Sequence, residues 1–583
     1  MSNCVPITTT PGSPTASPTS EYLGWVSTLD FGTPPSVTSD ATTWLQEAIN
    51  SVVATSGALY LLPRPYLITS GLVATGPCTL LGLQPFGRPT TVDSFTQDAS
   101  GNVTGCGTAS IVTTDGGLEM LCIVGSNVVI ENLNFITIPG TGSGGKAIHL
   151  QNNSNVRLEN VGIFGTQNGI LIDSASDISI KNSLIAPVAC PTGGPQYGIK
   201  ADSLTSLSDS KPPASGAFLQ NCVVDETMYP FKSGSNQPHN TDAFIIDNGY
   251  QRMDCLSCDA RAALHGFHSQ NVSGSTYGAN VNGFRVSFGR AYDCLVGVRL
   301  TDGQMAMVQD SLVLLDTRSG IAPSGSPNRG IFVEPGYSSG PIALSNNVVM
   351  GNCAGPSGMI GLDIEGAEVV TIAGGAILNC GASGTTALGS GTGLLLSTPA
   401  SGCHAIDGLL ITNCTSAGIH IASSHRGTAA LVGINAAGNR SGVSGTPSYG
   451  LLVDGSTGTP VGSFVIDGCN FTNNDVPVQN ASNTVGSGAT ALRRTVNNIG
   501  YNPLLTGAGA PSVTGTEFNN TGVDQFVYVA VSAGGSGTAS LTYGSGTTTG
   551  LGTLPGIFFV PNTAGITLAP NVGTTPSWEW IGN

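Results

Sequence analysis

The chain has 583 residues, of which only 9% are charged, and its formal net charge is −16. Its 19 Lys and Arg residues form no cluster, so the composition argues against a nucleic-acid-binding protein. No run of about 18 apolar residues occurs, so we predict no membrane span.

Residues 1–20 are rich in Thr, Ser and Pro and lack the basic and apolar segments of a secretory signal. Such a segment cannot form a packed core. We predict a flexible N-terminal arm, which either links or docks onto a larger assembly.

Residues 21–104 are predicted to form a cap and the entry to a repeat. Ser39 or Asp40 offers a helix N-cap, and Gly57 offers a helix stop. Strands are expected at residues 58–62, 66–69 and 79–82. Between the helix signals, one helical face is apolar: Trp44, Leu45, Ala48, Ile49, Val52 and Val53.

Residues 105–495 repeat one short pattern, in which apolar and polar residues alternate, an Asn follows, and apolar residues resume. Strand units that recur every 20–30 residues or so cannot bury their apolar faces alone, so they must stack on one another. An Asn at the bend tolerates left-handed backbone and can bond to the Asn of the next coil. The pattern therefore predicts a parallel β-helix. The clearest copies end at Asn132, Asn160, Asn182, Asn221, Asn346 and Asn413.

Fourteen Cys residues are present, and four of them lie beside the repeat position. We predict buried, reduced thiols at Cys222, Cys294, Cys414 and Cys469. Cys255 and Cys258 form a CxxC without the second pair that a zinc site needs. No calcium-loop pattern occurs either, so we predict no metal and no cofactor.

Residues 496–583 read differently, as short strands separated by Gly-rich turns. The strands are expected at residues 526–531, 538–543, 556–561 and 566–568. The Gly500-Tyr501-Asn502-Pro503 junction and the Trp578-Glu579-Trp580 ending resemble those of the small C-terminal β-sandwich modules on phage and bacterial β-helix proteins, so we expect such a module here.

The entry region resembles that of the pectin-lyase-like superfamily, in particular glycoside-hydrolase-28-related proteins and phage tailspikes. The likeness rests on an Asp-Phe-Gly turn, an amphipathic helix, a Leu-Pro strand end and a Tyr-x-Ile strand, at residues 30–32, 39–57, 62–63 and 66–68. The acidic loop usual in that family is replaced by Thr33-Pro34-Pro35-Ser36. The resemblance implies an all-β fold: a single-stranded right-handed parallel β-helix with an N-terminal capping helix and a C-terminal β-sandwich.

The resemblance also implies a bacterial surface polysaccharide as partner, a homotrimer, and a location on a virion tail, with the cell surface by another route as the alternative. We expect a tailspike or tail fibre protein that binds and cleaves that polysaccharide. A non-enzymatic fibre or carbohydrate-binding adhesin, and a free polysaccharide hydrolase or lyase, remain alternatives. Glycosidic hydrolysis needs two carboxyl groups, and adjacent coils would place such groups roughly 4.8 Å apart.

The irregular middle, residues 186–345, holds most candidate site residues. Asn240-Thr241-Asp242, Asp259, His265, His268 and Arg285 follow in an order similar to that of the polygalacturonase motifs. The likeness implies catalytic Asp242 and Asp259, with His265 or His268 standing for the catalytic histidine. We take His265 as catalytic, and His268 and Arg285 as binding substrate. No adjacent Asp-Asp pair follows, and Val286-Ser287 replaces a lysine, which puts the match in doubt.

Two further groups of polar residues are candidates. Asp225 and Glu226 form a second catalytic candidate, with a solvated loop tip as the alternative. Arg299 and Asp302 are candidate substrate contacts, and Asp302 can equally be a turn residue.

Overall fold

The computed structural model divides into two compact units, Met1–Met359 and Ile360–Asn583, which are described separately. The structure describes residues 25–83, 95–97, 103–138, 144–187, 196–203, 214–228, 241–270, 282–301, 305–315, 327–334, 340–351, 358–367, 369–381, 391–397, 402–442, 447–454, 463–480, 492–496, 498–499, 516–518, 525–532, 535–542, 548–560, 564–572, 574 and 576–581. The predicted arm, residues 1–20, lies outside the described residues. The predicted domain boundaries remain predictions.

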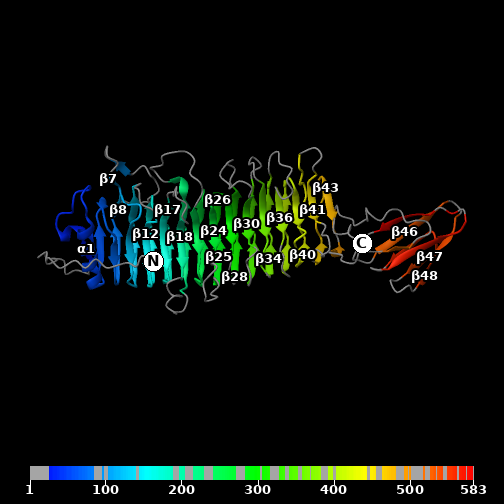
Figure 1. Cartoon of the computed structure of the whole chain (residues 1–583), viewed down its shortest axis with the longest axis horizontal. Coiled ribbons are helices and arrows are strands. Elements are labelled where there is room, and N and C mark those ends of the chain that lie inside the picture. The colour runs from blue at the N-terminus through cyan, green and yellow to red at the C-terminus, as the bar shows by residue number, and fades with distance from the viewer. Residues whose placement is uncertain are drawn as a thin grey trace. The chain divides into compact units, whose positions relative to one another are not determined.

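In unit 1 the chain winds through three parallel sheets, which receive one strand each per coil. Strands of successive coils lie side by side, and β12, β18 and β24 belong to one such row (Figure 1). Sheet A contains β1 (Trp25–Ser27), β2 (Ala58–Leu61), β5 (Cys78–Gly82), β10 (Val128–Glu131), β13 (Ser154–Glu159), β16 (Ser176–Lys181), β19 (Ala217–Gln220), β22 (Met253–Leu256), β25 (Asn282–Ser287), β28 (Met305–Gln309) and β31 (Pro341–Ser345). Sheet B contains β3 (Pro65–Leu67), β8 (Ser110–Thr113), β11 (Asn134–Thr137), β14 (Gly162–Phe164), β17 (Leu184–Ala186), β20 (Val223–Asp225), β23 (Asp259–Arg261), β26 (Arg290–Cys294), β29 (Leu312–Leu315) and β32 (Val348–Met350). Sheet C contains β4 (Leu72–Ala74), β9 (Glu119–Ile123), β12 (Lys146–Gln151), β15 (Asn168–Asp173), β18 (Gln196–Asp202), β21 (Thr241–Ile246), β24 (His265–Ser269), β27 (Val296–Leu300) and β30 (Asn328–Val333). A short hairpin, β6 (Phe95–Gln97) with β7 (Val103–Cys106), is antiparallel.

The core consists of apolar rows that run from coil to coil. In sheet C, Ile170, Ile199 and Phe244 are register partners on successive strands, and each is fully buried. Phe244 stacks on Phe267 of the next coil, with ring centroids 5.1 Å apart. Each such side chain contributes about 1.5–3 kcal/mol of burial free energy, so the rows hold the coils in register.

The corner between sheets A and B is the same in coil after coil. Asn132, Asn160, Asn182 and Asn221 each adopt left-handed backbone there, with φ between 50° and 57°. The Nδ2 of Asn160 donates to Oδ1 of Asn132 at 3.1 Å, and Asn221 donates to Asn182 at 3.2 Å. The predicted asparagine ladder is confirmed.

The predicted capping helix is α1 (Thr42–Thr55), which follows a 3₁₀ turn, η1 (Thr28–Phe31). The carboxylate of Asp40 accepts the Thr42 backbone N–H at 2.9 Å, so Asp40 rather than Ser39 satisfies the helix start. Gln46 uses its side-chain amide to bond both the N–H and the C=O of Val73, each at 2.8 Å. Val73 lies in β4, which is the edge strand of sheet C. The helix therefore supplies hydrogen-bond partners to edge backbone groups that have no neighbouring strand. None of the described helices is long and apolar enough to cross a membrane.

Unit 2 contains further coils and a separate module. Its sheet A strands are β34 (Val369–Ala373), β37 (Cys403–Asp407), β40 (Thr428–Val432), β42 (Ser463–Asp467) and β44 (Leu492–Val496). Its sheet B strands are β35 (Ala376–Leu378) and β38 (Leu410–Thr412). Its sheet C strands are β33 (Met359–Ile364), β36 (Thr392–Leu396), β39 (Ala417–Ile421), β41 (Tyr449–Val453) and β43 (Val476–Asn480).

The C-terminal module has two antiparallel sheets around their own apolar core. One sheet has the order β45 (Thr516–Phe518), β50 (Gly565–Pro570), β47 (Gly537–Thr542) and β48 (Thr548–Leu554). The other has the order β49 (Gly556–Val560), β46 (Gln525–Val531) and β51 (Pro576–Ile581). Val527, Val529, Val560 and Ile566 are fully buried between them, and this confirms the predicted β-sandwich.

The cysteines beside the repeat position are buried thiols, as predicted. Cys222, Cys294, Cys414 and Cys469 all have this character, and so do both members of the CxxC. Burial raises the pKa of the Cys222 and Cys258 thiols well above the ordinary value, so both stay protonated. They act as small apolar residues of the core.

Candidate functional site: the polar face of sheet C

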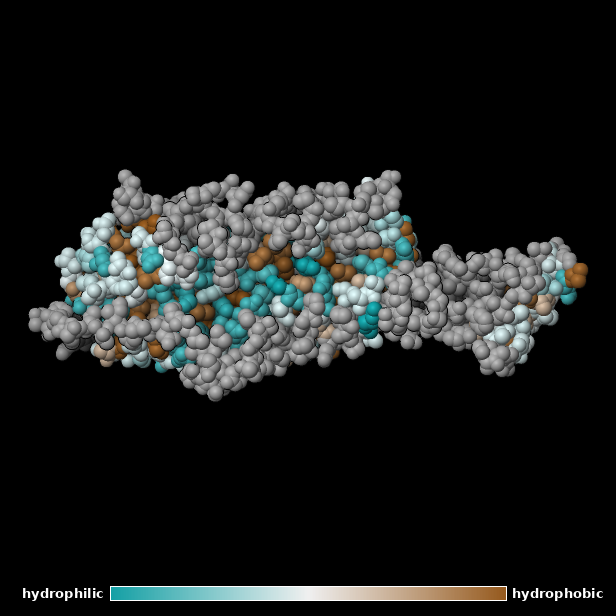
Figure 2. All heavy atoms as spheres, in the orientation of Figure 1, coloured by the Kyte–Doolittle hydropathy of each residue, from teal (hydrophilic) through white to brown (hydrophobic). Residues whose placement is uncertain are grey.

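The outer side of sheet C carries an unusual number of charged side chains in strands β9 to β30. Along each strand, aliphatic residues point into the coil and alternate with residues that point outward. Figure 2 shows hydrophilic side chains gathered over these strands, with hydrophobic ones among them. We call this surface the polar face, and its charged or titratable members include Glu119, Lys146, His149, Asp173, Tyr197, Lys200, Asp202, Asp242, Asp247, His265, His268, Arg299, Arg329 and Glu334.

One cluster of the polar face is centred on Asp242. Asp242 of β21 and His265 of β24 are register partners on adjacent coils, and His268 lies three residues further along β24. The two oxygens of Asp242 are engaged separately: Oδ1 bonds to Nδ1 of His265, and Oδ2 lies 3.1 Å from Nδ1 of His268. The imidazole centroids are 4.6 Å apart. The adjacent coils therefore bring together three of the residues that the sequence suggested.

Arg299 of β27 extends this cluster by one coil. Its NH1 lies 3.0 Å from Nε2 of His265, and its Nε donates to Glu334 at 2.9 Å. A guanidinium can only donate hydrogen bonds, so Nε2 of His265 is the acceptor and its Nδ1 carries the proton to Asp242. His268 is held at its far side by the Thr301 hydroxyl, 3.2 Å from Nε2.

Burial and these contacts move two pKa values in the cluster. Burial by itself would raise the pKa of Asp242, but the charge of His268 and the hydrogen bonds from both imidazoles outweigh it and hold the pKa below its usual range. Burial lowers the pKa of His265. Asp242 raises this pKa, but the charges of His268 and Arg299 lower it, and the net shift is downward. At neutral pH the pair is therefore an ionised carboxylate and a neutral imidazole.

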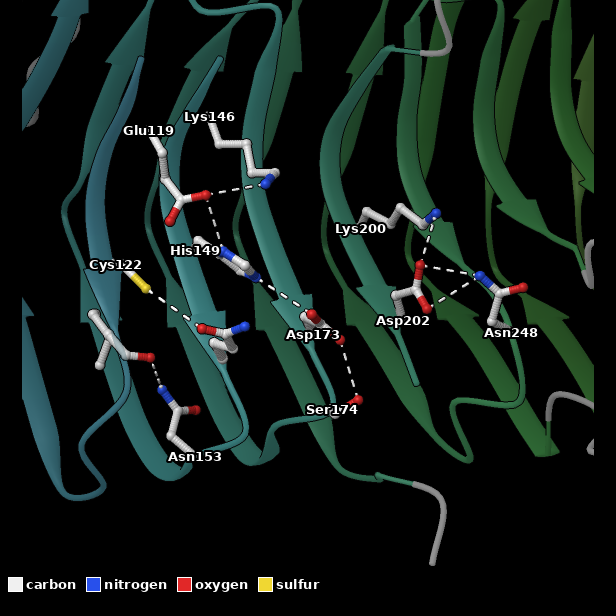
Figure 3. Close-up of polar contacts among 12 residues, drawn as sticks. Glu119, Cys122, Lys146, His149, Asn153, Asp173, Ser174, Lys200, Asp202 and Asn248 are labelled. Carbon is white, nitrogen blue, oxygen red and sulfur yellow. Dashed lines mark hydrogen bonds and ion pairs between the residues drawn. The ribbon is translucent and has the colours of Figure 1, made fainter. Parts of the chain in front are cut away.

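A second cluster lies on the coils that precede Asp242, and Figure 3 shows it. His149 of β12 stands between two carboxylates: its Nδ1 is 3.1 Å from Glu119, and its Nε2 is 3.5 Å from Asp173 of the next coil. Burial disfavours the charged ring, but the hydrogen bonds to Asp173 and Glu119 prevail and raise the pKa of His149. Lys146 completes the group with a 3.0 Å ion pair to Glu119.

Lys200 of β18 holds the next two carboxylates. Its Nζ lies 2.9 Å from Asp202 and 2.8 Å from Asp247. Both oxygens of Asp202 also lie 3.1 Å from the side-chain amide of Asn248. Burial opposes the charge of Lys200, but the two carboxylates raise its pKa, so it remains a cation at any ordinary pH.

Asp173 and Asp202 form a register-matched pair of carboxylates. They end β15 and β18 and face each other across adjacent coils. Their side chains keep 14% and 10% of their surface exposed, whereas Asp247 is fully buried. Neighbouring strands are about 4.8 Å apart, which is close to the roughly 5–5.5 Å between the carboxyl groups of retaining glycosidases.

Other predicted site residues lie on different sheets. Asp225 and Asp259 are buried in sheet B, where Asp225 accepts the Thr227 N–H at 2.7 Å and Asp259 accepts Nε of Arg290 at 2.5 Å. Arg285 belongs to sheet A and lies 4.0 Å from Asp254.

Glu226 begins a short 3₁₀ turn, η3 (Glu226–Met228), and is buried. It accepts the Thr241 N–H at 3.1 Å, so it supports the start of β21. The solvated loop tip considered for residues 225 and 226 is therefore wrong. Asp302 lies outside the described residues.

Sequence reasoning missed the carboxylates that end the sheet C strands. The signal for them is present, because strands opened by Gly-Ile or a relative end on an acidic residue at Asp173, Asp202, Asp247 and Glu334. That pattern recurs in register, so the acids must form a row on one face of the sheet.

No family model and no curated protein sequence matches the chain significantly. Several solved structures do match the chain. An N-terminal fragment of bacteriophage Phi29 gene product 12 matches with a TM-score of 0.53 and 12% identity, over 78% of this chain and 72% of that one. A double mutant of the tailspike protein of E. coli bacteriophage HK620 matches with a TM-score of 0.52 and 10% identity, over 95% and 92%. The chain therefore has the fold of a right-handed parallel β-helix, as the sequence predicted.

Proposed function

We propose that the chain is a phage-type tailspike or tail fibre protein that binds a bacterial surface polysaccharide on the polar face of sheet C and hydrolyses it. The observation that carries the proposal is the register-matched pair Asp173 and Asp202 within that face. The likeness to a phage tailspike supports a virion tail as the location. We propose a homotrimer as the assembly, as the resemblance of the entry region implies.

The two carboxylates have different surroundings, as a hydrolase requires. Asp202 forms an ion pair with Lys200, which stays protonated. This ion pair keeps the Asp202 carboxylate ionised, as a nucleophile must be. Asp173 lies 3.5 Å from the ring of His149, whose raised pKa makes it a proton source. His149 holds the proton and Asp173 stays ionised at rest, because the hydrogen bond between them favours the charged ring. We assign Asp173 as the relay that passes this proton from His149 to the leaving sugar oxygen.

The Asp242 cluster is assigned a binding role in the same face. Both oxygens of Asp242 and both ring nitrogens of His265 already have partners, so proton transfer would require breaking the network. Arg299 keeps 28% of its side chain exposed and can donate to sugar oxygens. Polar side chains over many coils suit a long chain of sugars better than a small molecule.

The test is incubation of the purified full-length chain with a panel of bacterial surface polysaccharides, followed by assays for new reducing ends and for the ultraviolet absorbance of unsaturated sugars. Reducing ends without absorbance are expected. Asp173→Asn and Asp202→Asn should each lower the rate by about 10²–10⁴-fold. Asp407→Asn, which removes an exposed carboxylate at the end of β37, is the matched control and should leave the rate unchanged.

Two other outcomes decide between functions. Unsaturated products would mean a lyase and would contradict the carboxylate pair. Binding without cleavage would favour the non-enzymatic adhesin, for which there is a specific observation: Glu119, Asp173, Asp202 and Asp247 all have cationic or hydrogen-bonding partners.

A further inference from the structure

We infer that Asp242, His265 and His268 form a binding site for a divalent transition-metal ion of the zinc class. The inference concerns these three side chains alone and stands whether or not the chain cleaves a glycan. One carboxylate oxygen and two imidazole nitrogens offer the donors.

The donor atoms are gathered closely enough. All three lie within 4.8 Å of one another. Zinc bonds to nitrogen and oxygen ligands are about 2.0–2.2 Å long, so tetrahedral ligands of one ion stand roughly 3.3 Å apart. Asp242 Oδ2 and His268 Nδ1 are at 3.1 Å already, and Asp242 Oδ1 bonds directly to His265 Nδ1. Small side-chain rotations would place the three donors around one ion.

The scaffold holds these donors in place. Asp242 and His265 are paired residues of two adjacent strands, so their separation is fixed by the backbone ladder. Their side chains are 16% and 8% exposed, and that of His268 is 3% exposed, which limits competition by water. The site is thus built on rigid strands rather than on loops.

The surrounding residues favour ligation by His268. A ring that binds metal through Nδ1 carries its hydrogen on Nε2, which needs an acceptor. The Thr301 hydroxyl lies 3.2 Å from Nε2 of His268 and provides one.

The donor set selects the kind of ion. Two imidazoles and one carboxylate suit Zn²⁺, Co²⁺, Ni²⁺ or Fe²⁺, whereas Ca²⁺ and Mg²⁺ prefer oxygen ligands throughout. Three protein ligands leave at least one position for water.

The contact between Arg299 and His265 disfavours metal binding by His265. With Nδ1 on the ion, Nε2 of His265 would carry the hydrogen and face a guanidinium donor at 3.0 Å. Metal binding therefore requires Arg299 to turn away, toward Glu334, which already accepts from its Nε at 2.9 Å. The Arg299–His265 contact and the bound ion exclude each other, so Arg299 acts as a competitor of the metal.

The experiment is a titration of the metal-free full-length chain with Zn²⁺ by calorimetry and with Co²⁺ by visible absorption, without any glycan. One ion per chain is expected. Asp242→Asn and His268→Gln should each weaken binding by at least about tenfold, and Arg299→Met should strengthen it by about tenfold. His420→Gln, at a His–Asp pair in unit 2, is the control and should leave affinity unchanged.

Circular dichroism and thermal unfolding show whether each variant is folded. If Asp242→Asn does not fold, His268→Gln alone tests the loss of a ligand. The inference is overturned if neither ion binds, if both ligand variants bind as the parent chain does, or if Arg299→Met weakens binding. Because no sugar is present, failure here leaves the glycan proposal untouched, and failure of glycan cleavage leaves this result untouched.

Discussion

Phe288 occupies the corner where five other coils of unit 1 place an Asn. Its φ is 53°, in the left-handed region, and its ring is 53% exposed. A residue other than Gly or Asn loses roughly 1–2 kcal/mol in this conformation, and the exposed ring recovers little by packing.

We therefore expect Phe288→Asn to stabilise the chain by about 1 kcal/mol, seen as a higher midpoint of thermal unfolding. The reverse change at another corner, Asn160→Ala, should destabilise by about 1–2 kcal/mol, because it adds the same backbone strain and removes the bond to Asn132. Equal midpoints for the parent chain and the Phe288→Asn variant would show that the corner tolerates any side chain.

At the scale of one element, strand β37 introduces an imidazole into the core of unit 2. His404 points inward beside Ile406, and His425, which follows β39, packs against it with ring centroids 5.6 Å apart. Burial lowers the pKa of each ring to about 4, and the charges of His404 and Arg426 add to the effect on His425. Both rings are therefore neutral in the folded chain near pH 7.

The pKa values of these rings are lower in the folded chain than in the unfolded chain, where they are about 6.5, so the unfolded state binds more protons as the pH falls. The two neutral rings make their full contribution to the free energy of unfolding above about pH 6.5. Between that pH and about pH 4 the free energy of unfolding falls by roughly 3 kcal/mol for each ring. Thermal unfolding between pH 7 and 4 measures this, and His425→Leu should flatten the curve. A curve of equal slope in His425→Leu would assign the acid sensitivity to other groups.

At the scale of the whole molecule, one sheet of the C-terminal module exposes three large apolar side chains. Tyr528 and Ile557 are paired residues on β46 and β49 and are 44% and 63% exposed, and Phe559 beside them is 43% exposed. Exposed apolar patches of this kind mark interaction surfaces. We propose that this sheet takes part in the homotrimer.

Ile557→Lys should then shift the chain from trimer to monomer in sedimentation velocity, because an ammonium group cannot be buried there without a partner. Val572→Lys, which places the same charge at a more exposed apolar residue outside the sheets, is the control. A parent chain that sediments as a monomer, or a trimer that survives Ile557→Lys, would refute this assignment.

Much of the fold could be predicted because each coil repeats its own local signal. The left-handed Asn, the alternating strand and the Gly-Ile strand are short-range patterns, and stacking then follows from burial. The site is different. Asp242, His265 and His268 could be grouped from their order, but Asp259 and Arg285 lie on other sheets, since loop lengths decide which sheet a segment joins. Asp173 and Asp202 resemble ordinary turn residues until the register pairs them.

The two-residue corner between sheets A and B has a consequence for how such a chain can change over time. Between β13 and β14, and again between β16 and β17, the corner has no room for an insertion, and its asparagines bond from coil to coil. The connections into sheet C vary widely, from Phe164–Asn168 in one coil to Asp225–Thr241 in another. Changes of ligand specificity should therefore arise by exchange of the segments that lead into or out of sheet C, while the asparagine corner preserves the frame. A designer could use the same division and graft such segments between β-helices without resetting the register of the coils.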